Sequence, residues 1–132
     1  MKLSDDVKPF DHLVLASVLR RHLDEGISMT VRLKPDEDIP DISIPGWAIT
    51  VRRGDGVATG EIASWQSYAV SEAHRAGASP CLAMRRGYGF WRFCVPLGLL
   101  TEDLAGPWSD IENLAELSLA GFVTLVRVHL NG

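Results

Sequence analysis

The chain has 132 residues, of which 46% are hydrophobic and 23% are charged, and its formal net charge is −4. These values are typical of a soluble globular protein, and the length fits a single domain over residues 1–132 with a loose polar tail at residues 1–9. No apolar run approaches the roughly 20 residues that a membrane-spanning helix needs. The acidic balance argues against tight, sequence-independent binding to nucleic acid, because phosphate contacts need clustered cations.

The first residues, MKLSDDVKPFDH, carry acids where a secretory signal peptide would have its apolar segment. We therefore expect a cytoplasmic protein. Its two cysteines, Cys81 and Cys94, lie in apolar runs and are too few to form a metal site. In a reducing cytosol we expect buried free thiols, although a disulfide is conceivable if the two face each other across a hairpin.

The first half of the chain predicts a helix followed by three strands. Apolar residues recur at helical spacing over residues 12–24, and an alternating apolar and polar pattern over residues 27–34 predicts a half-exposed strand. Residues 39–44 predict a second strand, which its prolines confine to an edge or make irregular. After a Pro45-Gly46 turn, residues 47–53 predict a third strand, which we expect to be central in the sheet.

The second half predicts two helices and three strands. Residues 58–76 form an amphipathic pattern whose apolar stripe we expect to pack on the sheet. Two apolar runs, residues 81–84 and 90–97, predict a hairpin. A capping-box pattern predicts a helix over residues 111–119, and residues 122–130 predict a last strand.

The expected order is helix, three strands, helix, two strands, helix, strand. In this order the chain resembles the αβββαβ core of restriction-endonuclease-like nucleases of the PD-(D/E)XK type. The run WQSYAVSEAHRAGASPCLAMRRGYGFWRFCVPL is similar to small phage nucleases related to Holliday-junction resolvases. The resemblance implies an α/β fold with a mixed central sheet flanked by helices, here with an extra C-terminal helix and strand, and a phage or prophage origin.

The resemblance also implies where an active site would lie. In that family an acid on the second strand and another on the third hold Mg²⁺, and a lysine two residues later orients the attacking water. The matching positions here are Asp41, Thr50 and Arg52, and Gln66 matches a helix glutamine that faces the site. Only Asp41 is a charged metal ligand, and Arg52 stays protonated. We therefore expect a catalytically degenerate site that binds metal weakly if at all, and no resident cofactor.

Two alternatives stay open. A helix carboxylate, Glu61 or Glu72, could replace the missing acid, and the protein would then be an active Mg²⁺-dependent endonuclease. The chain could instead be a small phage interaction or inhibitor protein unrelated to nucleases, in which Asp41, Thr50 and Arg52 have only structural roles.

Arginines at strand ends and in a glycine-rich turn form a candidate nucleic-acid surface, because arginine reaches phosphates and an aromatic ring can stack on a base. The residues are Arg52, Arg53, Arg85, Arg86, Tyr88 and Arg92. We expect the partner to be either DNA or a host or phage protein, with a homodimer as a further option and no membrane partner.

Overall fold

The computed structural model describes residues 11–54, 59–85, 89–101 and 108–131, so the tail predicted at residues 1–9 lies outside the described residues. The helices are α1 (Asp11–His22), α2 (Thr59–Ala76) and α3 (Leu119–Asn131). The strands are β1 (Thr30–Val31), β2 (Ile42–Ile44), β3 (Trp47–Arg53), β4 (Ser79–Arg85), β5 (Arg92–Pro96) and β6 (Leu114–Leu117). Two 3₁₀ turns, η1 (Leu97–Leu99) and η3 (Ile111–Asn113), flank the gap at residues 102–107.

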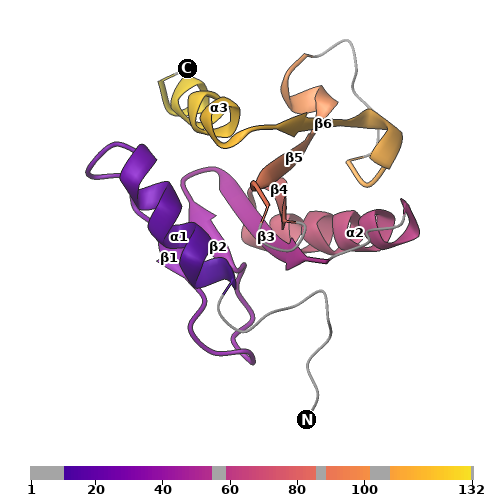
Figure 1. Ribbon diagram of the computed structural model, residues 1–132, viewed down its shortest axis with the longest axis horizontal. Coiled ribbons are helices and arrows are strands. Elements are labelled where there is room, and N and C mark those ends of the chain that lie inside the picture. Colours follow the sequence, from indigo (N-terminus) through magenta and orange to yellow (C-terminus); the bar gives the residue numbers. More distant parts are fainter. Residues whose placement is uncertain (1–10, 55–58, 86–88, 102–107, 132) are drawn as a thin grey trace.

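The strands form one sheet in the order β1-β2-β3-β4-β5-β6. Neighbouring strands are antiparallel except β3 and β4, which are parallel and are connected through α2. The order α1, β1 to β3, α2, β4 is the expected αβββαβ core, so the predicted fold class is confirmed. The central position predicted for β3 is also confirmed, since β3 lies beside β4 in the middle of the sheet (Figure 1).

Each face of the sheet is covered by different helices. Ile49 and Val51 of β3 face the cluster that contains residues of α1 and α3, whereas Leu82 of β4 faces α2. Since side chains alternate along a strand and Thr50 pairs with Leu82, Thr50 lies on the α2 face. Figure 1 shows the same division, with α1 and α3 on one side of the strands and α2 on the other.

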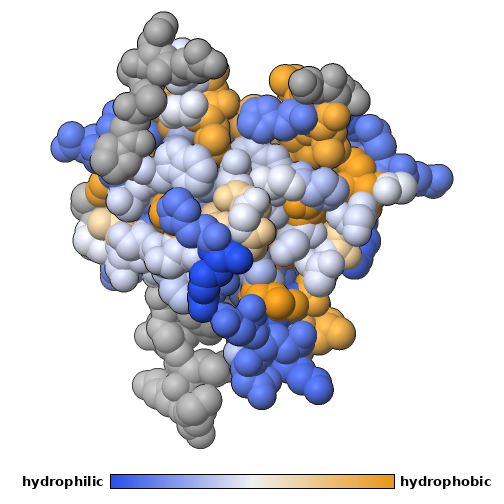
Figure 2. Space-filling model, turned by 180° about the vertical axis from the view of Figure 1, so that it is seen from behind, coloured by the Kyte–Doolittle hydropathy of each residue, from blue (hydrophilic) through white to orange (hydrophobic). Residues whose placement is uncertain are grey.

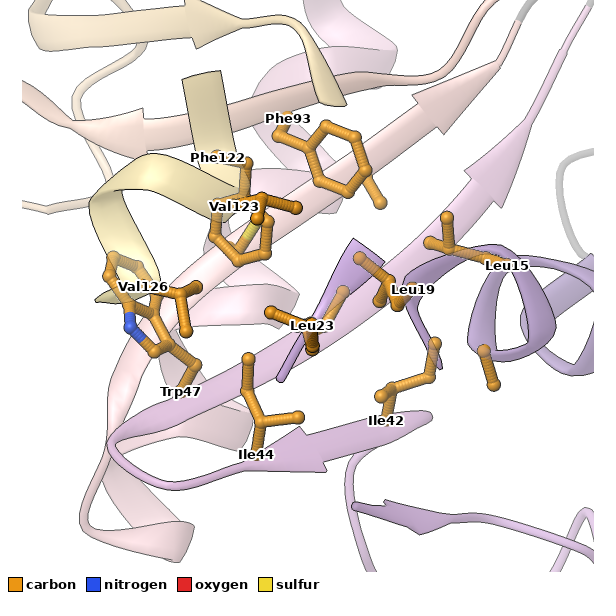
Figure 3. Packing of buried hydrophobic residues seen from close by; sticks show 14 of the residues in the cluster. Leu15, Leu19, Leu23, Ile42, Ile44, Trp47, Phe93, Phe122, Val123 and Val126 are labelled. Atoms are coloured by element: carbon orange, nitrogen blue, oxygen red, sulfur yellow. The ribbon is translucent and has the colours of Figure 1, made fainter. Parts of the chain in front are cut away.

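The larger core lies between α1, α3 and the sheet (Figure 3). Aromatic rings meet at its centre: Phe122 of α3 stacks on Phe93 with centroids 4.8 Å apart, and Trp47 meets Phe122 edge-on at 5.3 Å. Leucines of α1 fill the space beside them, including Leu15 and Leu19. The core therefore joins the first and last helices of the chain across β3 and β5.

A smaller core lies under α2. Trp65 is 5% exposed and packs with Ala69, Leu82 and Cys94. Alanines on this stripe allow the helix to approach the sheet closely, as their spacing predicts, although Ala76 at the helix end is exposed. The expectation that α2 packs on the sheet is confirmed. None of the described helices is long and apolar enough to cross a membrane.

The expected extra C-terminal helix and strand are both present, but their predicted bounds and order are wrong. Residues 111–119 contain the short turn η3 followed by β6, and residues 122–130 lie within helix α3. The Oγ of Ser118 accepts a hydrogen bond from the N–H of Gly121 at 3.1 Å and so caps α3. Phe122, Val123 and Val126 are buried at helical spacing, so tertiary packing overrides the strand preference of the valines.

The expected edge strands are shorter than the sequence pattern indicates. Pairing covers only Thr30–Val31 of the run 27–34 and Ile42–Ile44 of the run 39–44. Leu33, expected on the buried face, is exposed beyond the end of β1. An alternating pattern predicts which side chains are buried only where a partner strand is paired with the run. Here the pairing with β2 ends at Val31, before Leu33.

The cysteines are free and buried, and they lie on opposite faces of the sheet, because Cys94 pairs with Leu82 rather than with Cys81. The conceivable disulfide is therefore wrong. Burial, with a smaller contribution from the nearby charge of Glu116, raises the pKa of Cys94 to about 12. Burial also raises the pKa of Cys81 well above its usual value, so both thiols are poor nucleophiles at neutral pH.

Figure 2 shows the molecule from behind, with apolar patches scattered among hydrophilic surface. Apolar and hydrophilic residues are therefore interspersed on this side of the molecule.

Truncation of Trp65 to alanine should destabilise the protein by about 3–5 kcal/mol, because it leaves a cavity between α2 and the sheet. Urea denaturation followed by circular dichroism measures the change. The matched control is Phe90→Ala, which truncates an exposed aromatic and should change the stability by less than about 0.5 kcal/mol. Equal effects of the two substitutions would contradict the packing of α2.

Candidate functional site

Asp41 is positioned by the tight hairpin between β2 and β3. Gly46 adopts φ of +84° in the turn, a conformation that favours glycine. The turn pairs Ile44 with Trp47 and Ile42 with Ile49, which brings the residue before β2 next to the end of β3. Accordingly, Oδ2 of Asp41 accepts a hydrogen bond from the backbone N–H of Val51 at 2.9 Å.

Two arginines make the remaining contacts to the carboxylate oxygens of Asp41. Arg32 donates to Oδ1 from Nε at 3.0 Å and from Nη2 at 2.8 Å. Arg52 approaches Oδ2 with Nη1 at 3.4 Å. The Asp41 side chain is 12% exposed, so these contacts are largely screened from water. Both oxygens are therefore already bound to positive or partially positive donors.

The contacts continue along α2. The guanidinium of Arg52 lies 5.0 Å from the ring centroid of Tyr68. The pKa of Tyr68 is raised, first by burial and then by its hydrogen bond to Glu72. Glu72, buried, pairs with Arg75 at 2.5 Å, and Arg75 reaches Asp38 at 2.8 Å.

We call this connected set the Asp41 cluster: Arg32, Asp38, Asp41, Arg52, Tyr68, Glu72 and Arg75. Three carboxylates in it are matched by three guanidinium groups, so the cluster has no net charge when all six are ionised. The cluster ties β1, β2 and β3 to α2 on one face of the sheet.

The structure brings some of the four candidate site residues together and places Gln66 elsewhere. Asp41 and Arg52 meet as expected, and Thr50 is buried on the same face of the sheet. Gln66 takes another direction, because its Nε2 donates to the backbone oxygen of Trp108 at 2.9 Å. Its Oε1 is buried without a hydrogen-bond partner among the described residues. Gln66 therefore anchors the segment before η3 and is not brought to Asp41.

Sequence reasoning missed Arg32, which makes the closest contacts to Asp41. The only available signal was its place on the polar face of the pattern at residues 27–34, and that place does not specify a partner. The contact of Tyr68 with Arg52 crosses from α2 to β3, so no local sequence pattern predicts it.

The chemistry open to this arrangement is limited. Among the described residues, no three His, Cys, Asp or Glu side chains are grouped so that they could hold a metal ion. Of the two carboxylates that could replace the missing acid, Glu61 is exposed in the first turn of α2 and Glu72 is bound by Arg75. A divalent cation at Asp41 would have to displace guanidinium groups that already neutralise the carboxylate.

The candidate nucleic-acid residues are also engaged within the protein. Arg53 pairs with Asp11 at 3.4 Å, and Arg92 pairs with Glu116 at 3.5 Å. Arg85 donates to the backbone oxygen of Gly89 at 2.8 Å and lies 5.4 Å from the ring centroid of Trp91. Arg86 and Tyr88 lie outside the described residues. Nucleic-acid binding by this set stays a prediction.

No protein-family model matches the chain, and no curated protein matches it. Among solved structures, the chain is similar to Hjc of Archaeoglobus fulgidus, a Holliday junction resolvase from an archaeal hyperthermophile. The sequence identity is 17% and the TM-score is 0.45, over 89% of this chain and 96% of that chain. The αβββαβ topology itself rests on the pairing and order of this chain's own strands.

Asp41→Asn should destabilise the fold by about 3 kcal/mol, the lower end for breaking a buried ion pair, because it leaves Arg32 and Arg52 without their shared anion. Chemical denaturation at neutral pH measures the loss. Asp38→Asn is the matched control, since that carboxylate is 76% exposed and its loss should change little. If Asp41→Asn is as stable as the wild type, the cluster does not hold the strands together.

Proposed function

We propose that this domain is nuclease-like in fold but no longer cleaves nucleic acid, and that it acts by binding a macromolecular partner. The observation that supports this is the state of Asp41. The acid at the first metal-ligand position is bound by Arg32, Arg52 and the N–H of Val51. A phage or prophage origin stays a prediction.

Phosphodiester cleavage in a site of this kind depends on a cation that polarises the phosphate and acidifies a water molecule. Such a cation needs several hard, anionic oxygen ligands. Position 50 offers a buried hydroxyl, and position 52 offers a guanidinium group that cannot act as a base. The residues present therefore do not fit a catalytic Mg²⁺ ion.

The alternative of an active enzyme with a relocated acid is less well supported. Glu61 points from an exposed position of α2, and the buried carboxylate of Glu72 already has a guanidinium partner. Neither residue is free and close to Asp41 in the way that a metal site requires.

Of the two partner classes, protein is favoured over DNA. Arg52 and Arg53 each have a carboxylate partner and are less than one fifth exposed, so their charge is partly neutralised before any phosphate arrives. The chain as a whole carries a net charge of −4. Both features lower the electrostatic contribution on which non-specific DNA binding depends.

Calorimetric titration with Mg²⁺ or Mn²⁺ should show no site tighter than roughly millimolar, the weak end for oxygen-ligand sites. Incubation with duplex, single-stranded and branched DNA should give no metal-dependent cleavage. Cleavage that needs Mg²⁺ and disappears in Asp41→Asn would instead establish the active enzyme.

Restoring the missing ligands tests the proposal from the other direction. Thr50→Glu with Arg52→Lys adds the second acid and the lysine, and Arg32→Ser then frees Oδ1 of Asp41. We expect the triple variant to bind Mn²⁺ at least about tenfold more tightly than the wild type, because two carboxylates replace one neutralised carboxylate. Adding Asp41→Asn to the triple variant is the control and should abolish the gain. No gain in the folded triple variant would argue against a former metal site here.

Binding to DNA should be weaker than about 10 µM at 150 mM salt, within the range of non-specific binding. Gel-shift titrations on duplex, single-stranded and branched DNA at two salt concentrations measure it. Tight binding that falls steeply with salt and is lost in Arg85→Ser would move the proposal from a protein partner to DNA.

A further inference from the structure

A groove of about 680 Å³ opens at one end of the sheet, between α1, the end of the β4–β5 hairpin and the start of α3. Val14 and Val18 of α1 line one wall, and Leu119 of α3 lines another. Figure 1 shows α1 and α3 on the same side of the sheet, which is the side away from α2 and the Asp41 cluster. The groove is therefore separate from the degenerate site.

The groove gathers apolar groups that the fold leaves in water. Phe90, at its edge, is 88% exposed, and Val14 is 47% exposed although it lies on a helix whose other face is in the core. Single exposed apolar residues are common, but a concave surface that gathers several of them marks a site that excludes water when occupied. A partner that fills the groove would bury Phe90 and Val14 together.

Two arginines line the groove. Its described lining residues include Arg85 and Arg92 and no carboxylate, in a chain with a net charge of −4. Arg92 and its partner Glu116 are both more than half exposed, so their contact is weak and can be exchanged for another anion. The groove therefore matches an occupant with apolar side chains flanked by acids.

We infer that this groove docks a short amphipathic helix of another protein, with apolar residues on one face and Asp or Glu beside them. Helix-in-groove binding uses apolar anchors at positions i, i+3 or i+4 and i+7, which would contact the apolar walls of the groove. The acids of the partner helix would reach Arg85 and Arg92 at the rim.

Single-stranded nucleic acid fits the same groove less well. Val14, Val18 and Leu119 are aliphatic and present no ring on which a base can stack. The guanidinium of Arg85 already lies over the ring of Trp91, so that ring is partly occupied. Of the two large aromatic side chains in the described lining of the groove, Phe90 alone presents an exposed face to a base.

The inference deepens the proposed function by naming the surface and the chemistry of a protein partner. The two proposals, the groove and the loss of catalysis, can fail independently, because no described residue that lines the groove belongs to the Asp41 cluster. Metal and cleavage assays test the latter, and peptide binding tests the groove.

The probe is a set of fluorescein-labelled 18-residue helices with leucine at i, i+3, i+4 and i+7, and with Glu, Lys or Ser at the flanking positions. Fluorescence anisotropy against the full-length protein measures binding, and an 18-nucleotide single strand is titrated in parallel. We expect the Glu helix to bind in the micromolar range and at least about tenfold more tightly than the Lys helix, from complementary charge.

Phe90→Asp and Val14→Asp should each weaken binding of the Glu helix at least tenfold, and Arg92→Ser should reduce its preference over the Ser helix. Leu33→Asp is the matched control, because Leu33 is an exposed apolar residue outside the groove, and it should leave binding unchanged. Circular dichroism confirms that each variant is folded. The inference is overturned if no helix binds below about 100 µM, if the Lys helix binds as tightly, if Phe90→Asp has no effect, or if the single strand binds more tightly than the Glu helix.

Discussion

The carboxylate of Asp41 is the point on which this side of the sheet depends. It joins Arg32 at the end of β1 to Val51 and Arg52 at the end of β3. β1 and β2 pair over only two residues, so backbone hydrogen bonds alone hold this edge weakly. A shared side-chain anion adds the connection that the short ladder lacks. The guanidinium groups of Arg32 and Arg52 supply the positive charge that balances this carboxylate.

The kind of cation beside a buried carboxylate decides which chemistry the site can support. A guanidinium group and a divalent cation both neutralise a buried carboxylate, but only the cation can activate water and accept phosphate oxygens as ligands. Arg52 adds a further structural role, since it also donates to the backbone oxygen of Val51 and lies against Tyr68. The face under α2 is thus joined to the strands by ion pairs in which guanidinium groups neutralise the Asp41 carboxylate.

The sequence predicts β3 with its bounds and α2 to within one residue at its start, because local pattern and tertiary packing agree there. The prediction fails where the same residues fit both the two-residue period of a strand and the 3.6-residue period of a helix. In the run FVTLVRVHL the valines favour a strand, while Phe122, Val123 and Val126 also form a helical stripe, and the helix wins by burying them on Phe93 and Trp47. In the site, the turn at Pro45-Gly46 brings Asp41 and Arg52 together predictably. The direction of the Gln66 side chain is not predictable in this way. Each residue of a helix is rotated by about 100° from the one before, so a small change in how α2 lies on the sheet decides which segment Gln66 contacts.

Phe90 and Trp47 show why the groove calls for a functional explanation. Trp47 is buried and contributes to the core through Phe122, so its presence is explained by stability. Phe90 is almost fully exposed and has no comparable part in the core, so removing it should hardly affect folding. Exposed apolar surface beside the further apolar walls of Val14 and Leu119 favours association with other molecules. The basic side chains around it select among those molecules, since a cationic rim disfavours cationic partners and attracts acidic ones. The apolar walls would provide most of the binding free energy, and the arginines would provide the specificity for acidic partners. A surface hollow without a binding role would need neither feature.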